Sequence, residues 1–256
     1  DPKIARRGLV YMDDSKKDDR VKVAISTGDV DHAKHVSTVL PGMDNVPSED
    51  IKDHVENAEL VHKHAAYNAG IPKNEVATIA WMYDTPQGGQ VVSSKYATKA
   101  SHEIGSALEG MHAFRHTNGI ERAHTSLLGH SYGSTTAGKV AKMIRKGVLD
   151  DLVMYGSPGA GAHDAREYNL DHGRPYVSGI KSDDAVKGKG TLNSKFGNNP
   201  MFMPGVKHLA NNSERDRSFF IPWKMFDRHS EYLEEGTSSL EDISRVVTNV
   251  PVKGEK

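Results

Sequence analysis

The segment TSLLGHSYGSTTAG at residues 125–138 constrains this chain most, because an apolar run ends there in a G-x-S-x-G motif followed by small residues. The apolar run predicts a strand at residues 124–128, and the small residues predict a helix at 134–146. Ser131 would then occupy a sharp strand-to-helix turn, with glycines on both sides that let neighbouring backbone pass close by. Such a turn exposes a hydroxyl and directs the amide of Tyr132 at a developing oxyanion. A chance match in a glycine-rich chain is the alternative, and the flanking strand and helix weigh against it.

Short β-rich runs alternate with helical stretches along most of the chain. Strands are expected at residues 21–26, 36–40, 76–83, 124–128, 152–155 and 175–180. Helices are expected at 49–69, 93–117 and 134–146, with a closing helical stretch at 230–247. This alternation favours an α/β fold with a mostly parallel central sheet and helices on both faces. We expect a single domain over residues 1–256, in which residues 186–217, rich in Gly, Asn, Lys and Pro, form a flap or pocket loop.

Composition excludes several classes of function. Lys plus Arg number 33 against 34 Asp plus Glu, so no excess charge drives binding to nucleic acid or anionic lipid. The absence of cysteine excludes disulfides, thiolate metal sites and cysteine nucleophiles. No apolar run reaches the roughly 18 residues of a membrane-spanning helix, and residues 1–30 lack the apolar core of a signal peptide. Because Asp1 is not an initiator methionine, we expect a trimmed, soluble chain that is either cytoplasmic or secreted.

Metal and cofactor chemistry find little support. His112 and His116 lie four residues apart on a predicted helix, the spacing of two metal ligands, but no third ligand is identifiable. The loop GSPGAG at residues 156–161 lacks the spacing of G-x-G-x-x-G, and no P-loop lysine follows it. We therefore expect no metal and no organic cofactor.

A serine hydroxyl is a poor nucleophile without a base, so a histidine and a carboxylate are expected farther along the chain. Asp183 and Asp184 follow the predicted strand at 175–180, where a triad acid would lie, and either one fits by position. His229 comes just before the closing helical stretch and is the candidate base. The order Ser, Asp, His is the order in which such triads occur on one large class of α/β enzymes.

The loop PGMD at residues 41–44 is expected to supply the second oxyanion donor, because it follows the predicted strand at 36–40. Pro41 has no N–H, which leaves the amides of Gly42 and Met43, and we favour Met43. An ordinary turn is the alternative.

Large apolar side chains between the candidate acid and the histidine are the candidate substrate-binding residues: Met201, Phe202 and Met203. They would form an acyl pocket or pack this loop onto the domain, and the sequence supports the two equally.

Seven ordered motifs resemble a largely actinobacterial family of predicted α/β-hydrolases without a settled physiological role: HVSTVLPGM, TIAWMYDTPQG, SLLGHSYGSTTAG, LVMYGSPGAG, SDDAV, KFGNNP and HSEYL. The resemblance covers about residues 8–247 and implies an α/β-hydrolase fold with the triad Ser131, Asp184 and His229. Asp184 is favoured because the family pattern resembles Gly-Asp-Pro-Val, although Asp183 and Ala185 depart from it.

These features together predict a bacterial serine hydrolase of the carboxylesterase or lipase type. It would cleave an ester or related acyl bond of a small-molecule or lipid-like substrate, with the amides of Tyr132 and Met43 as the oxyanion hole. Two alternatives stay open: an acyltransferase that uses the same triad, and a catalytically silent binding module of a larger protein.

Overall fold

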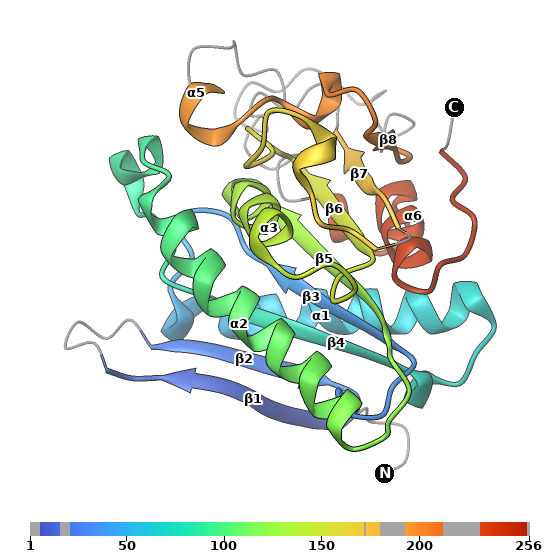
Figure 1. Ribbon diagram of the computed structural model, residues 1–256. Helices are drawn as coiled ribbons and strands as arrows, with labels where there is room; N and C mark the ends of the chain where they lie inside the picture. Colours follow the sequence, from blue (N-terminus) through green and yellow to red (C-terminus); the bar gives the residue numbers. More distant parts are fainter. Residues whose placement is uncertain (1–5, 16–20, 172, 180–192, 212–230, 255–256) are drawn as a thin grey trace.

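The computed structural model describes residues 6–15, 21–171, 173–179, 193–211 and 231–254. Within them one eight-stranded sheet has the order β1-β2-β4-β3-β5-β6-β7-β8 (Figure 1). The strands are β1 (Arg7–Asp13), β2 (Lys22–Thr27), β3 (His35–Leu40), β4 (Val76–Met82), β5 (His124–His130), β6 (Asp151–Tyr155), β7 (Pro175–Ser178) and β8 (Lys207–His208). Strand β2 runs antiparallel to β1 and β4, and every neighbouring pair from β4 to β8 is parallel. The predicted mostly parallel sheet is confirmed.

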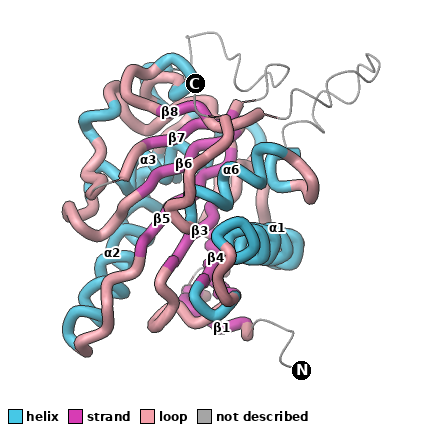
Figure 2. The backbone as a smooth tube through the Cα atoms, turned by 90° about the vertical axis from the view of Figure 1, so that its right-hand side faces the viewer, coloured by secondary structure: helices cyan, strands magenta, loops and turns pink. Residues whose placement is uncertain are grey.

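Helices cover both faces of this sheet. Helices α1 (Pro47–Ala69) and α6 (Ser238–Val247) pack together on one face, and α2 (Lys95–Thr117) and α3 (Tyr132–Met143) pack together on the other (Figure 2). The short helix α5 (Asn193–Phe196) is accompanied by 3-10 turns at Lys73–Glu75, Gly88–Val92, Ala165–Glu167, Pro200–Phe202 and Glu231–Leu233. Among the described helices, none is both long and apolar enough to cross a bilayer.

A proline and a glycine set the two ends of α1. Pro47 occupies the first turn, where its missing N–H leaves no bond unmade. Gly70 ends the helix at φ 64°, and the N–H of Ile71 donates to the carbonyl of Ala66. A left-handed residue closes a helix end at little cost when it is glycine. These are the proline and glycine signals that predict this helix from sequence.

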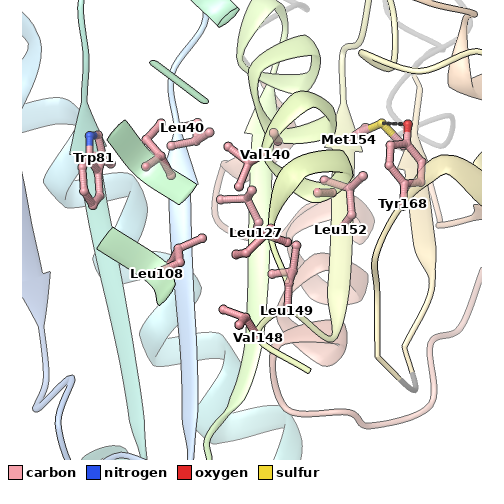
Figure 3. Packing of buried hydrophobic residues seen from close by; sticks show 14 of the residues in the cluster. Leu40, Trp81, Leu108, Leu127, Val140, Val148, Leu149, Leu152, Met154 and Tyr168 are labelled. Carbon is pink, nitrogen blue, oxygen red and sulfur yellow. Dashed lines mark hydrogen bonds between the residues drawn. The ribbon is translucent and has the colours of Figure 1, made fainter. Parts of the chain in front are cut away.

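The core lies in two layers, one on each side of the sheet. Leu127 of β5 packs into the layer under α2 and α3, with Leu108 and Val140 (Figure 3). Leu128, the next residue, packs into the layer under α1 and α6. Because successive side chains of a strand point to opposite faces, an unbroken apolar run supplies both layers. This explains why all seven residues of β4 are buried.

The structure differs from the sequence expectations at four elements: β1, α3, α5 and β8. Strand β1 was not expected; it is an edge strand in which no residue is fully buried, so it lacks the signal of a covered strand. Helix α3 begins at Tyr132, directly after Ser131 and two residues earlier than expected. The described part of the expected flap, residues 193–211, includes α5 and β8, and β8 pairs with β7.

His124, at the beginning of β5, lies close to two aspartates. Its Nε2 lies 2.9 Å from Oδ2 of Asp151, and its Nδ1 lies 3.7 Å from Oδ2 of Asp150. Burial opposes the charged form of this residue, His124, but the hydrogen bond to Asp151 and the two carboxylate charges outweigh burial and raise its pKa. The ring of His35 lies 5.9 Å away, and burial, followed by the charge of His124, lowers the pKa of His35.

His124→Gln should lower the free energy of unfolding more at about pH 6 than at about pH 8.5. A raised folded-state pKa means that the protonated ring adds stability that is complete below the unfolded-state pKa of about 6.5 and is lost as pH rises through the folded-state value. Urea unfolding at both pH values measures the difference. His35→Gln is the matched control and should show the opposite trend; an equal loss at both pH values for His124→Gln would contradict the expectation.

Candidate active site

Ser131 sits in a strained turn between β5 and α3. Its backbone angles are φ 50° and ψ −124°, a region that side-chain-bearing residues rarely adopt and that costs about 1–3 kcal/mol. The N–H of Ser131 donates to the carbonyl of Tyr155 at 2.9 Å, and its carbonyl accepts from the N–H of Ser134. The hydroxyl does not cap the helix that follows. The turn therefore leaves this hydroxyl available to a reacting group.

Backbone passes too close to the turn for a side chain at either flanking glycine. A Cβ at Gly129 would lie 2.6 Å from the carbonyl oxygen of Gly133, and a Cβ at Gly133 would lie 2.5 Å from that of Pro41. Contacts under about 3 Å do not occur at real Cβ atoms, so both positions require glycine for lack of space. The two glycines of the motif thus pack the turn against itself and against the loop after β3.

The loop after β3 lies directly beside Ser131. Leu40 pairs with Gly129 in the parallel register, so the following residues run level with the turn. A Cβ at Gly42 would lie 3.0 Å from Cβ and 3.5 Å from Oγ of Ser131. Asp44 braces the loop, since its N–H donates to the carbonyl of Pro86 and its carboxylate accepts from the N–H of Gly88.

Two amide groups beside Ser131 are available to a ligand. Tyr132 is the first residue of α3, where backbone N–H groups have no intrahelical acceptor. In the described part of the chain, no residue accepts a hydrogen bond from the N–H of Met43, whose own carbonyl accepts from Nδ2 of Asn45. These are the amides that the sequence predicts for the oxyanion hole.

Aromatic side chains hold both neighbours of Ser131. The ring of His130 stacks on Tyr155 at 5.2 Å. The hydroxyl of Tyr132 donates to the carbonyl of Ser93 at 2.6 Å and accepts from the N–H of Ala97 at 3.2 Å. The side chain of Tyr132 therefore fastens the turn of Ser131 to the beginning of α2.

A cavity of about 280 Å³ opens beside Ser131. The end of β3 and its loop line one part of it, and helix α1 lines another. The residues that line it are Val39, Leu40, Pro41, Gly42, Met43, Asn45, Asp50, Asp53, His54, Asn57, His130, Ser131, Tyr155 and Leu233. The four from α1 are not among the predicted site residues, although Asp50, Asp53, His54 and Asn57 have the i, i+3, i+4, i+7 spacing of one helix face.

His54 is the buried member of this face. Its side chain is almost fully buried, with 6% of the residue exposed, and its Nε2 lies 3.0 Å from the carbonyl oxygen of Val39. Burial, only partly opposed by hydrogen bonds to backbone carbonyls, lowers the pKa of His54 to about 4. The ring is therefore neutral near pH 7 and donates to the end of β3.

The remaining predicted site residues lie elsewhere. Asp183, Asp184 and His229 are outside the described residues. Met203 is only 4% exposed and belongs to the core with Met201 packed against it, whereas Phe202 is 83% exposed. None of these three lines the cavity beside Ser131. Met201 and Met203 pack this loop onto the domain, whereas Phe202 does not.

A model of the family described as "Alpha/beta hydrolase" matches residues 16–194. The chain belongs to this family. An uncharacterized protein of Mycobacterium tuberculosis is 29% identical to this α/β-hydrolase over 213 residues, covering 80% of this chain and 77% of the relative. A second uncharacterized protein of that organism is 35% identical over 184 residues, covering 68% of this chain and 26% of the relative, so the match spans about a quarter of that longer protein.

A solved structure extends the likeness of fold. Carboxyl esterase 2 from the mycorrhizal fungus Tuber melanosporum superposes with a TM-score of 0.50, covering 95% of this chain and 85% of that chain at 8% identity. At this identity the likeness concerns the fold alone. The expected α/β-hydrolase fold is confirmed, and the mycobacterial relatives agree with the predicted actinobacterial family.

Gly133→Ala should lower the free energy of unfolding by about 1–3 kcal/mol, because the new methyl group meets backbone oxygens that cannot move away without shifting β3. Urea unfolding measures the loss. Gly110→Ala is the control: no atom lies within 4 Å of its Cβ position in α2, and replacing a helical glycine should stabilise by about 0.5–1 kcal/mol. Equal effects of the two substitutions would contradict the close approach of the backbones.

Proposed function

We propose that this α/β-hydrolase is a serine hydrolase that cleaves a carboxylic ester or related acyl bond. The observation that carries the proposal is the strained backbone turn at Ser131. Ser131 lines an open cavity and lies directly beside the loop after β3. A non-glycine residue in this conformation is retained where function requires it. This geometry agrees with a nucleophile elbow, the sharp strand-to-helix turn that carries the catalytic serine of α/β-hydrolases.

Ser131 is the nucleophile and His229 the general base, with Asp184 as the acid that orients the imidazole. His229 takes the hydroxyl proton as Oγ attacks the carbonyl carbon, and then gives that proton to the departing alkoxide. Water attacks the resulting acyl-enzyme by the same route and releases the acid. Two observations support these roles: Leu233, four residues after His229, lines the cavity, and Asp184 follows the end of β7 at Ser178 by six residues.

The amides of Tyr132 and Met43 form the oxyanion hole in this proposal. Both flank Ser131, one at the beginning of α3 and one in the loop that touches the nucleophile through Gly42. Backbone donors held in place before the reaction stabilise the charge of the tetrahedral intermediate without reorganising. Removing one such donor typically costs about 10²–10³ in rate. The bracing of the loop by Asp44 serves this purpose.

Ser131→Ala should abolish labelling by a fluorophosphonate probe, because the probe reacts only with an activated serine. His229→Ala should slow labelling by about 10³-fold or more, since triad members act as a unit. Mass spectrometry of the labelled peptide measures both. Asp184→Asn and Asp183→Asn form a matched pair, of which only the first should slow the reaction.

Retained labelling in a folded Ser131→Ala variant would overturn the proposal. No labelling of the folded wild-type protein would favour the silent binding module instead. Ester turnover whose product depends on an added acceptor alcohol would identify an acyltransferase.

Gly42→Ala should lower ester turnover by about ten- to a hundredfold. The new methyl group lies 3.0 Å from Cβ of Ser131, so the nucleophile or the adjoining amide must shift, and small misplacements cost this much. Steady-state kinetics with a short p-nitrophenyl ester measures the change. Gly89→Ala, with no atom within 4 Å of its Cβ position, is the control and should leave turnover unchanged. Equal turnover of both variants would show that the position of the loop after β3 does not affect catalysis.

A further inference from the structure

The wall of the cavity that α1 supplies is polar along its whole length. Asp50, Asp53, His54 and Asn57 all line the cavity from one face of the helix. Asp53 and Asn57 are exposed at the mouth, Asp50 is half-buried, and His54 is buried. Four polar side chains of one helix, buried to different degrees, thus line the cavity beside Ser131.

The charge on this wall is of one sign. The described lining residues include two carboxylates and neither lysine nor arginine. His54 adds no positive charge near pH 7, because burial holds its pKa at about 4. No cationic side chain in the described ranges lies within ion-pair distance of Asp50 or Asp53; the nearby Lys52 faces Glu56 instead. The two carboxylates are therefore not neutralised by this part of the chain.

Asp50 is fixed by the fold, whereas Asp53 is not. Oδ2 of Asp50 accepts a hydrogen bond from the N–H of Val46 at 2.6 Å, which orders the beginning of α1. Asp53 stands one helical turn farther along, exposed at the mouth of the cavity. A carboxylate in a concave site concentrates the electric field and attracts ligands of opposite charge from solution. Asp53 is thus the exposed carboxylate of this wall, whereas the exposed Asn57 carries no charge.

We propose that the substrate of Ser131 carries an ammonium group close to the scissile ester, and that this group enters the cavity toward Asp53 and Asp50. The inference rests on the proposed serine hydrolase and adds the class of its substrate. An alkyl chain in the same place would remove water from Asp50 and the Asn57 amide without replacing their hydrogen bonds, which is unfavourable. An ammonium group instead supplies a positive charge that offsets the two carboxylates.

The test compares two fluorophosphonates that differ in one atom: one ends in a trimethylammonium group and the other in the uncharged tert-butyl isostere. Each modifies Ser131 when Oγ displaces fluoride, so no knowledge of the natural ester is needed. The second-order rate constants are measured by mass spectrometry at low ionic strength. The cationic probe should react about three- to fivefold faster, and added salt should reduce this ratio.

Asp53→Asn should lower the ratio of the two rate constants toward one, because it removes one of the two carboxylate charges and keeps the size of the side chain. Glu56→Gln is the matched control: it removes the same charge from the same helix, at a position that does not line the cavity, and should leave the ratio as in the wild type.

Equal rates of the two probes with the wild-type protein, or a faster neutral probe, would overturn the ammonium substrate while leaving the serine hydrolase intact. An unchanged ratio in Asp53→Asn would likewise overturn it. Failure of both probes to modify Ser131 would overturn the proposed function itself, and with it this inference.

Discussion

Two stretches of backbone meet at the turn of Ser131 with no side chain between them, and the geometry of the candidate site depends on that contact. Gly133 fits against the carbonyls of Leu40 and Pro41, and Gly42 fits against Ser131. The contact ties the turn after β5 to the loop after β3, two segments far apart in sequence. Because neither backbone can relax without moving the other, the unfavourable φ of Ser131 is held by the fold.

The sheet supplies the stability that holds this strain. Strands β3, β5 and β6 are parallel neighbours buried under helices on both faces, and Ser131 is bonded through its N–H to the carbonyl of Tyr155 at the end of β6. Fully burying one leucine or valine contributes about 1.5–3 kcal/mol, so a few core residues offset the cost of the turn. The carboxyl edge of a parallel sheet is where such a turn can be both supported from below and open above.

Sequence predicts the elements of this site better than it predicts their surroundings. The turn at Ser131 is predictable because glycine spacing, an apolar run and small residues coincide within residues 125–138. Helix α1 is predictable from Pro47 and Gly70, but the cavity that its polar face lines depends on which element stands opposite, and that is a tertiary fact. Apolar character alone could not distinguish a pocket from a core at Met203, which is buried in the core.

Opposite electrostatic demands meet in the cavity. In the proposed mechanism, the amides of Tyr132 and Met43 favour negative charge on the reacting oxygen, whereas the carboxylates of α1 raise the free energy of that charge. A neutral substrate would leave this conflict in place. A substrate with an ammonium group resolves it, because the cation offsets the carboxylates as the oxyanion forms. On this proposal, the carboxylates of α1 lower activity toward neutral esters and favour cationic ones, so the same side chains would select the substrate and assist its reaction.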